Sequence, residues 1–165
     1  MKKPAEYFRA GAGAVIIDGR GLVLALERAG IAGAWQFPQG GLKSGEEPIS
    51  AVYREITEET GIAGSALELL ESAPEPLVYE LPPEARSAKT GRGQVQYWFL
   101  FRFHGDESAI NVERGGEFRA WQWLHFPDLL KATVEFRRPV YRRLAELFGG
   151  YLALQGRIEG VSLES

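Results

Sequence analysis

Residues 40–62 read GGLKSGEEPISAVYREITEETGI, and this stretch decides the fold. Pro48 suits the first turn of a helix, and Gly61 is placed to end that helix in a left-handed conformation. Between them, apolar residues recur on one face at Ile49, Val52 and Ile56. We therefore predict an amphipathic helix that starts at Pro48, ends at Gly61 and packs one face against a sheet.

The opposite face of this helix is acidic. Glu55, Glu58 and Glu59 stand at i, i+3 and i+4, so their Cβ atoms would lie about 5–6 Å apart, and each like-charged pair costs an isolated helix about 0.2–0.5 kcal/mol. Taken alone, three such glutamates favour a solvated helix face with Arg54 paired to Glu58. A divalent cation would relieve the repulsion, and carboxylate-rich sites favour Mg²⁺ or Mn²⁺.

The wider spacing decides between these two interpretations. The stretch matches the pattern G-x5-E-x7-R-E-U-x-E-E-x-G-U, where U is apolar, at every specified position: Gly40, Glu46, Arg54, Glu55, Ile56, Glu58, Glu59, Gly61 and Ile62. This is the Nudix box, and the chain resembles Nudix hydrolases on that basis.

The resemblance implies an α/β fold, the Nudix α/β/α sandwich with a mixed β-sheet between helices, and cleavage of a phosphoanhydride bond in a nucleoside diphosphate derivative. Glu55, Glu58 and Glu59 would hold Mg²⁺, which Mn²⁺ or another divalent cation could replace. Glu46 would support the site and Arg54 would orient the glutamates. Gly40 and Gly61 would shape the loops, with Gly40 part of the metal site.

Outside the box, the patterning predicts strands and two further helices. Residues 13–17 and 22–26 flank a glycine-bearing turn and read as a hairpin, and Pro127 and Pro139 each introduce a helix. A glycine-rich connection follows residue 26 and ends in residues 35–41, and residues 82–93 read as a mobile loop. Further strands are predicted at residues 66–70, 77–81, 94–103 and 120–124.

Composition limits the class of protein. The chain of 165 residues is long enough for one hydrophobic core, so we expect a single domain over residues 1–150 and a weakly patterned, partly disordered tail over residues 151–165. It contains no cysteine, which excludes thiol nucleophiles and zinc–cysteine sites, and no apolar run is long enough to span a membrane. The net charge of −3 argues against a protein that coats nucleic acid, and no DNA partner is expected. We expect a cytoplasmic protein.

Four further stretches indicate which branch of the Nudix family the chain resembles. Residues 35–41, 93–100, 117–123 and 134–143 resemble the branch that contains RNA pyrophosphohydrolases and dinucleoside polyphosphate hydrolases, and with the box they extend the similarity over most of residues 7–148. In that branch, a glutamate matching Glu117 joins the metal site. Residues matching Val134, Phe136 and Arg137 hold a base in that branch, and arginines matching Arg9 and Arg28 approach the nucleotide. The resemblance therefore implies substrate-binding roles for these five residues, and Tyr79, near the position of a tyrosine in diadenosine-polyphosphate members, is a further candidate.

The sequence therefore favours an enzyme that uses Mg²⁺ to remove pyrophosphate from a 5′-triphosphorylated RNA end, or to split diadenosine tetra- and pentaphosphates. A general nucleotide or ADP-ribose pyrophosphatase is the enzymatic alternative, and a catalytically inactive sensor on the same scaffold is the alternative from another class. Either Glu55 or Glu117 could be the general base. Gln94 and Gln96 fit both phosphate contacts and polar positions of a strand, and residues 82–93 are expected to grip the leaving part of the substrate. The sequence does not indicate an oligomeric state.

Overall fold

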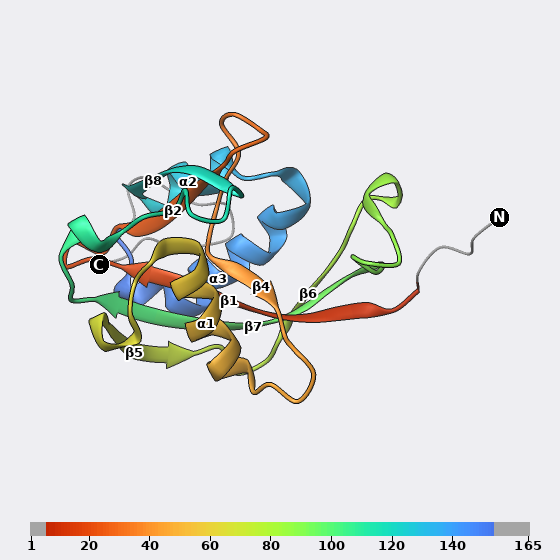
Figure 1. The fold of residues 1–165 in the computed structure, drawn as a ribbon, viewed down its shortest axis with the longest axis horizontal. Helices are drawn as coiled ribbons and strands as arrows, with labels where there is room; N and C mark the ends of the chain where they lie inside the picture. The colour runs from red at the N-terminus through yellow and green to blue at the C-terminus, as the bar shows by residue number, and fades with distance from the viewer. Residues whose placement is uncertain (1–5, 154–165) are drawn as a thin grey trace.

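The structure, a computed structural model, describes residues 6–153 as one mixed sheet of eight strands with helices on both faces (Figure 1). The strands are β1 (Phe8–Ile17), β2 (Val23–Arg28), β3 (Trp35–Gln36), β4 (Gln39–Gly41), β5 (Leu67–Ser72), β6 (Leu77–Glu80), β7 (Gly93–Phe103) and β8 (Phe118–Leu124). The helices are α1 (Pro48–Thr60), α2 (Phe126–Ala132) and α3 (Arg138–Phe148), with short 3-10 helices at Gly64–Ala66, Pro83–Ala85, Glu107–Ala109, Glu135–Arg137 and Gly149–Tyr151.

The centre of the sheet is the parallel pair β1 and β7, in register from Phe8 beside Gly93 to Ile17 beside Arg102. All other strand pairs are antiparallel. On its other edge β1 changes partner, pairing with β4 along Gly11–Gly13 and with β2 at Ile17. Likewise β7 pairs first with β6 and then with β5. Both central strands therefore change partner along their length. The short strand β4, which pairs with β1, places the following helix α1 close to β1.

Two hydrophobic clusters lie on the two faces of the sheet. Val52 and Ile56 of α1 pack with Ala12, Ala14 and Ile16 of β1 on one face. On the other face, α2 and α3 pack against the alternate side chains of β1 and β7, including Val15, Ile17, Trp98 and Leu100. This alternation is the period of two that a strand covered on both sides requires. The α/β fold with a mixed sheet between helices is thereby confirmed.

The helix predicted from the acidic stretch is present. Pro48 occupies its first turn, and Gly61 follows Thr60 with φ 76°, donating its N–H to the Thr57 carbonyl at 2.9 Å. Pro127 and Pro139 lie in the first turns of α2 and α3, as expected. Gly61 is a position that needs glycine, because its backbone is in the left-handed region.

Three expectations need correction or completion. Residues 35–41 are not only a connection, since they form β3 and β4, which are too short to show alternation in sequence. Residues 82–93 contain a 3-10 turn and an isolated bridge between Ser87 and Gly91. Residues 151–153 contact the β1–β2 turn, where the Ala153 N–H donates to the Gly21 carbonyl. The rest of the predicted tail, residues 154–165, lies outside the described residues, so the tail stays a prediction.

Among residues 6–153, no helix is both long and apolar enough to cross a membrane.

Candidate functional site

The acidic face of α1 meets the backbone of β4 at Gly40. A methyl group added at Gly40 would lie 2.0–2.3 Å from the carboxyl atoms of Glu55, closer than any real contact. Glycine is therefore required here for close approach, and the missing side chain leaves the space that Glu55 occupies. The Glu55 side chain is only 13% exposed as a result.

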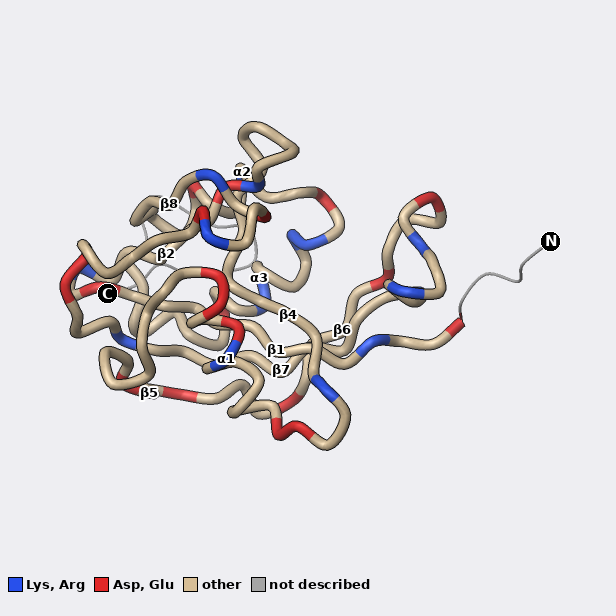
Figure 2. The backbone as a smooth tube through the Cα atoms, viewed as in Figure 1, with Lys and Arg blue, Asp and Glu red and all other residues tan. Residues whose placement is uncertain are grey.

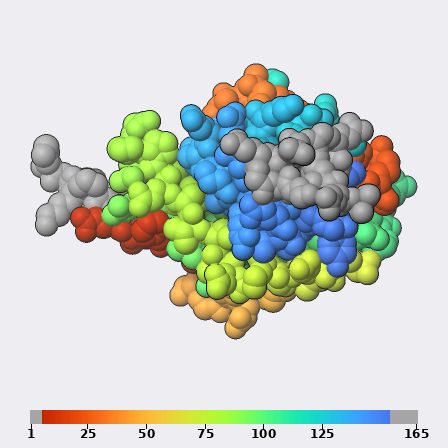
Figure 3. Space-filling model, turned by 180° about the vertical axis from the view of Figure 1, so that it is seen from behind, coloured from red at the N-terminus to blue at the C-terminus, as the bar shows by residue number. Residues whose placement is uncertain are grey.

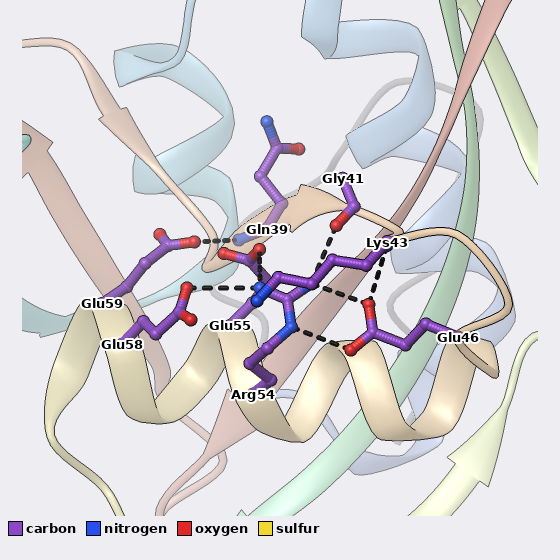
Figure 4. Close-up of polar contacts among 8 residues, drawn as sticks. All are labelled: Gln39, Gly41, Lys43, Glu46, Arg54, Glu55, Glu58 and Glu59. Atoms are coloured by element: carbon purple, nitrogen blue, oxygen red, sulfur yellow. Dashed lines mark hydrogen bonds and ion pairs between the residues drawn. The ribbon is translucent and has the colours of Figure 1, made fainter.

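Arg54 lies at the centre of the cluster (Figure 4). Its Nε and Nη2 donate to the two oxygens of Glu46, each at 2.8 Å, and Nη2 also donates to the Gly41 carbonyl at 2.9 Å. Its Nη1 donates to Glu55 Oε1 at 2.7 Å and to Glu58 Oε2 at 3.2 Å. One guanidinium thus holds the loop before α1 and two carboxylates of α1 in a fixed arrangement.

Glu46 is held from two sides. The Arg54 guanidinium and the Lys43 backbone N–H, which donates at 2.9 Å, lower the pKa of Glu46 to about 2. Glu46 is therefore ionised at neutral pH, and its charge positions Arg54.

Glu59 is the most unusual carboxylate of the site. It is 7% exposed, its Oε1 accepts the Gln39 N–H at 3.1 Å, and its Oε2 is buried without a hydrogen-bond partner among residues 6–153. Burial raises its pKa well above the usual value, and the nearby charges of Glu117 and Glu55 raise it further. A buried carboxylate oxygen that faces other carboxylates and lacks a donor is stabilised by a cation.

A small cavity of about 170 Å³ brings the predicted acidic residues together. Its lining consists of Glu55, Glu58, Glu59, Val112, Gly115, Glu117 and Phe118. All four predicted metal-binding glutamates therefore face one space, although Glu117 comes from the loop before β8 and lies 58 residues beyond Glu59 in the chain. A wider groove of about 740 Å³ shares Glu58 and Gly115 with this cavity and adds the guanidinium of Arg114.

Within residues 6–153, no three acidic or histidine side chains are already gathered around one point as metal ligands. The hydrogen bonds explain this, because Arg54 holds one oxygen each of Glu55 and Glu58, and Gln39 holds one oxygen of Glu59. The shared cavity and the unpartnered Glu59 oxygen nevertheless fit a cation, since each carboxylate keeps a second oxygen.

The predicted substrate-binding residues fall into two groups. Arg28 does not line the acidic cavity, but its Nη1 pairs at 3.3 Å with Oε1 of Glu117, which does. The others gather near β4 and β6, on the α3 face. There Phe136 stacks on Tyr79, with ring centroids 5.6 Å apart, and Arg137 lies over the Phe136 ring at 5.2 Å.

Tyr79 is buried in this group. Its ring is covered by Phe136, so a base could stack on Phe136 but not on Tyr79 in the same place. Burial raises the pKa of the Tyr79 hydroxyl, which the neighbouring Arg137 opposes. Arg137 Nη1 also donates to Gln36 Oε1 at 3.0 Å, and Val134, at the start of the same turn, is half-buried.

Gln39 is a residue of the site that sequence reasoning missed. Its backbone N–H holds Glu59, while its side-chain oxygen accepts from Gln96 Nε2 at 2.7 Å. Gln96 is buried and also donates to Gln94 Oε1 at 3.0 Å. A chain of amides therefore runs from Glu59 at the acidic cavity to Gln94, which lies opposite Tyr79 in the sheet. The only sequence signal was the alternation of Gln94 and Gln96, which fitted a structural role equally well.

Comparison with known proteins agrees with this geometry. The NUDIX domain family model matches residues 7–144. "RNA pyrophosphohydrolase" of Cereibacter sphaeroides is 40% identical over 152 residues, covering 88% of this chain and 93% of that protein. "Nudix hydrolase 25" of Arabidopsis thaliana is 35% identical over 169 residues, covering 95% of each.

Among solved structures, a C. elegans Ap4A hydrolase binary complex superposes with a TM-score of 0.66 at 23% identity, covering 86% of this chain and 98% of that one. This likeness concerns the fold. It agrees with the mixed sheet and its two helical layers.

Proposed function

The chain belongs to the Nudix family of hydrolases, and from this membership we propose that it removes pyrophosphate from the 5′-triphosphorylated end of RNA. Members of this family generally use divalent cations, and for this chain we propose Mg²⁺, with Mn²⁺ as a substitute. The relatives named RNA pyrophosphohydrolase support this substrate, because three of them are 38–40% identical over 88% of the chain. We further propose that it acts in the cytoplasm, where RNA 5′ ends and free nucleotides occur.

One observation carries the proposal. Four carboxylates line a single cavity, and one buried oxygen of Glu59 has no donor. Such a cluster is poorly suited to a structural role, since burying a carboxylate without compensation destabilises the fold. It is well suited to holding cations against the phosphates of a substrate.

The residues of the chain divide the chemistry between them. A divalent cation bound in the cavity would neutralise phosphate charge and make a water molecule more acidic. Glu58 and Glu59 would hold it with Glu55, and Arg54 keeps Glu55 and Glu58 oriented through Nη1. The proton of the attacking water passes to a carboxylate at the cavity, and both Glu55 and Glu117 meet that requirement.

The nucleotide would lie on the α3 face. Phe136 is half-buried and carries Arg137 against its ring, so it offers a stacking surface beside a cation. Arg9 supplies a further cation for the nucleotide. Its guanidinium lies directly over Gly41, whose carbonyl accepts a hydrogen bond from Arg54. Arg28, which pairs with Glu117 of the cavity lining, is suited to bind a phosphate oxygen once Glu117 turns to other partners.

Diadenosine tetra- and pentaphosphates present the same chemistry, with a nucleotide, a chain of phosphates and a water attacking phosphorus. We propose them as second substrates of the same cavity. The adjoining groove of about 740 Å³, with Arg114 at its edge, offers room for the part of the substrate that departs.

The test compares initial rates on a triphosphorylated RNA octamer, diadenosine tetraphosphate and ADP-ribose at equal concentration, with products identified. The proposal expects pyrophosphate and 5′-monophosphorylated RNA as the main products. Preference for ADP-ribose would overturn the substrate assignment. The Glu58→Gln/Glu59→Gln double variant separates an enzyme from a sensor, since an enzyme loses turnover by orders of magnitude whereas a binder changes only its affinity.

A further inference from the structure

Part of the sheet projects beyond the helical layers as an arm. The arm consists of residues 6–10, at the start of β1, and residues 77–95, which comprise β6, the following loop and the start of β7. Figure 1 shows this hairpin and the first part of β1 extending together away from α1, α2 and α3. Seen from behind, they protrude from the body of the molecule (Figure 3). The base of the arm packs against the hydrophobic cluster on the α3 face through Leu77, Tyr79 and Leu81, and no residue of the arm lines the acidic cavity.

The strand register joins the arm to the nucleotide face. Arg9 lies beside Gln94 in the parallel pair, and Tyr79 lies opposite Gln94 in the antiparallel pair. Side chains that are direct neighbours across a sheet point to the same face, so these three share the face of Gln96. Arg92 precedes Gln94 by two residues and continues the ladder, because its N–H donates to Tyr7 and its carbonyl accepts from Leu81.

The arm contains four basic residues, Arg9, Arg86, Lys89 and Arg92, and three acidic ones, Glu6, Glu80 and Glu84, so its formal charge is +1, whereas the chain as a whole carries −3. Arg86 and Arg92 both pair with one carboxylate, Glu80, at 3.4 Å and 3.1 Å. A guanidinium has five N–H donors, so Arg92, whose side chain is 43% exposed, retains donors for another anion. Lys89 is exposed at the tip of the hairpin. Figure 2 shows basic segments on both the hairpin and the start of β1.

An exposed aromatic ring accompanies these cations. Tyr7 is 47% exposed, and its hydroxyl donates to the Ala88 carbonyl across the arm. Its ring lies against Gly91, where φ is 73° and an added Cβ would lie 3.0 Å from Tyr7 Cε2. The ring is therefore held in place by the hairpin while one side faces solvent. Cations beside fixed aromatic rings are characteristic of surfaces that bind single-stranded nucleic acid.

We propose that the arm binds the RNA strand downstream of its 5′ end, with Arg92 and Lys89 contacting phosphates of later nucleotides. This inference rests on the proposed function. Tyr79, on which Phe136 stacks, lies opposite Gln94, and Arg92 lies two residues from Gln94 on the extended chain, about 7 Å away. Lys89 lies three residues beyond Arg92, so a strand whose first base stacks on Phe136 would reach these two side chains with its following nucleotides. The arm therefore favours an RNA chain, and it assigns residues 82–93 to the retained strand instead of the departing pyrophosphate.

The experiment measures kcat/KM on a triphosphorylated RNA octamer, a triphosphorylated dinucleotide and diadenosine tetraphosphate. The wild-type protein should prefer the octamer. Lys89→Gln/Arg92→Gln should lower kcat/KM for the octamer about tenfold, through KM, and leave the two short substrates within about twofold. The slope of log kcat/KM for the octamer against log salt concentration should become less steep by about 1.4, since each phosphate contact with a single strand contributes about 0.7 to that slope.

Arg20→Gln is the matched control. Arg20 is 65% exposed, pairs with Asp18 and lies in the turn at the opposite end of β1, so its loss should affect no substrate. The inference would be overturned if the double variant lost kcat/KM equally on all three substrates, or if its kcat/KM for the octamer equalled that of the wild-type protein. If the wild-type protein hydrolyses nucleotides but no RNA, the proposed function fails. Binding of a labelled octamer to the metal-free protein then still tests the arm, because equal affinity of wild type and double variant would refute it.

Discussion

Glu59→Gln should have opposite effects on stability and on catalysis. The Glu59 side chain is almost fully buried, its Oε2 has no donor, and Glu55 and Glu117 add like charge. Replacing the carboxylate by an amide removes the buried charge and supplies an N–H₂ group that can donate to Glu55. In the absence of metal, the variant should therefore be more stable than the wild-type protein.

The size of the gain follows from the unsatisfied oxygen. A buried polar group without a partner costs about 1–3 kcal/mol, and in a chain of this length 1 kcal/mol shifts the melting temperature by about 2–4 °C. Turnover should fall by about two to four orders of magnitude, because the cavity loses one of its anionic ligands.

The assay is thermal unfolding in excess chelator and again in Mg²⁺, together with initial rates. Addition of Mg²⁺ should raise the melting temperature of the wild-type protein and leave that of Glu59→Gln nearly unchanged. Glu58→Gln is the control, since Glu58 is 54% exposed and its loss should change metal-free stability by less than about 0.5 kcal/mol. A lower melting temperature of Glu59→Gln in chelator would refute the reasoning, because it would make Glu59 a structural carboxylate.

Three further predictions follow from particular contacts. Gly40→Ala should reduce turnover at least about tenfold with unchanged circular dichroism, because the added methyl group displaces the Glu55 carboxylate; normal activity would contradict the close approach. Phe136→Leu should raise KM about tenfold and leave kcat nearly unchanged, as expected for loss of base stacking, whereas Phe136→Tyr should restore KM. Arg119 lowers the pKa of Glu27 below 4.5, so this stabilisation is present above pH 4.5 and is lost as pH falls through the lowered pKa. Between pH 6 and pH 3, the free energy of unfolding measured in urea should therefore fall less steeply for Glu27→Gln than for wild type. The same pH dependence in both proteins would show that the Arg119–Glu27 contact does not stabilise the fold.

The acidic stretch predicted its own structure well. The helix boundaries, the left-handed Gly61 and the common cavity of Glu55, Glu58 and Glu59 all follow from local spacing, which fixes the relative positions of residues within one helix turn. Glu117 was found only through the resemblance, since no local pattern connects it to α1.

Contacts between distant segments could not be predicted from spacing. The Gln39 N–H reaches Glu59 because β4 pairs with β1, and a strand of three residues gives no periodic signal. The sequence named Tyr79 and Phe136 as separate candidates but did not predict that Phe136 covers Tyr79. Their stacking depends on how the segment that leads into α3 lies on the sheet. The sequence predicted the strands of the arm at residues 77–81 and 94–103 and the loop at residues 82–93, but not its projection, which depends on where the helical layers end.

Metal dependence tests the central claim most directly. The protein is first freed of metal, verified by elemental analysis, and initial rates on the triphosphorylated RNA octamer are then measured in excess chelator and after titration with Mg²⁺. Turnover should be lost in chelator and restored by Mg²⁺. An undiminished rate in the verified metal-free protein would contradict the account, because the four carboxylates would then work without the cation that their arrangement requires.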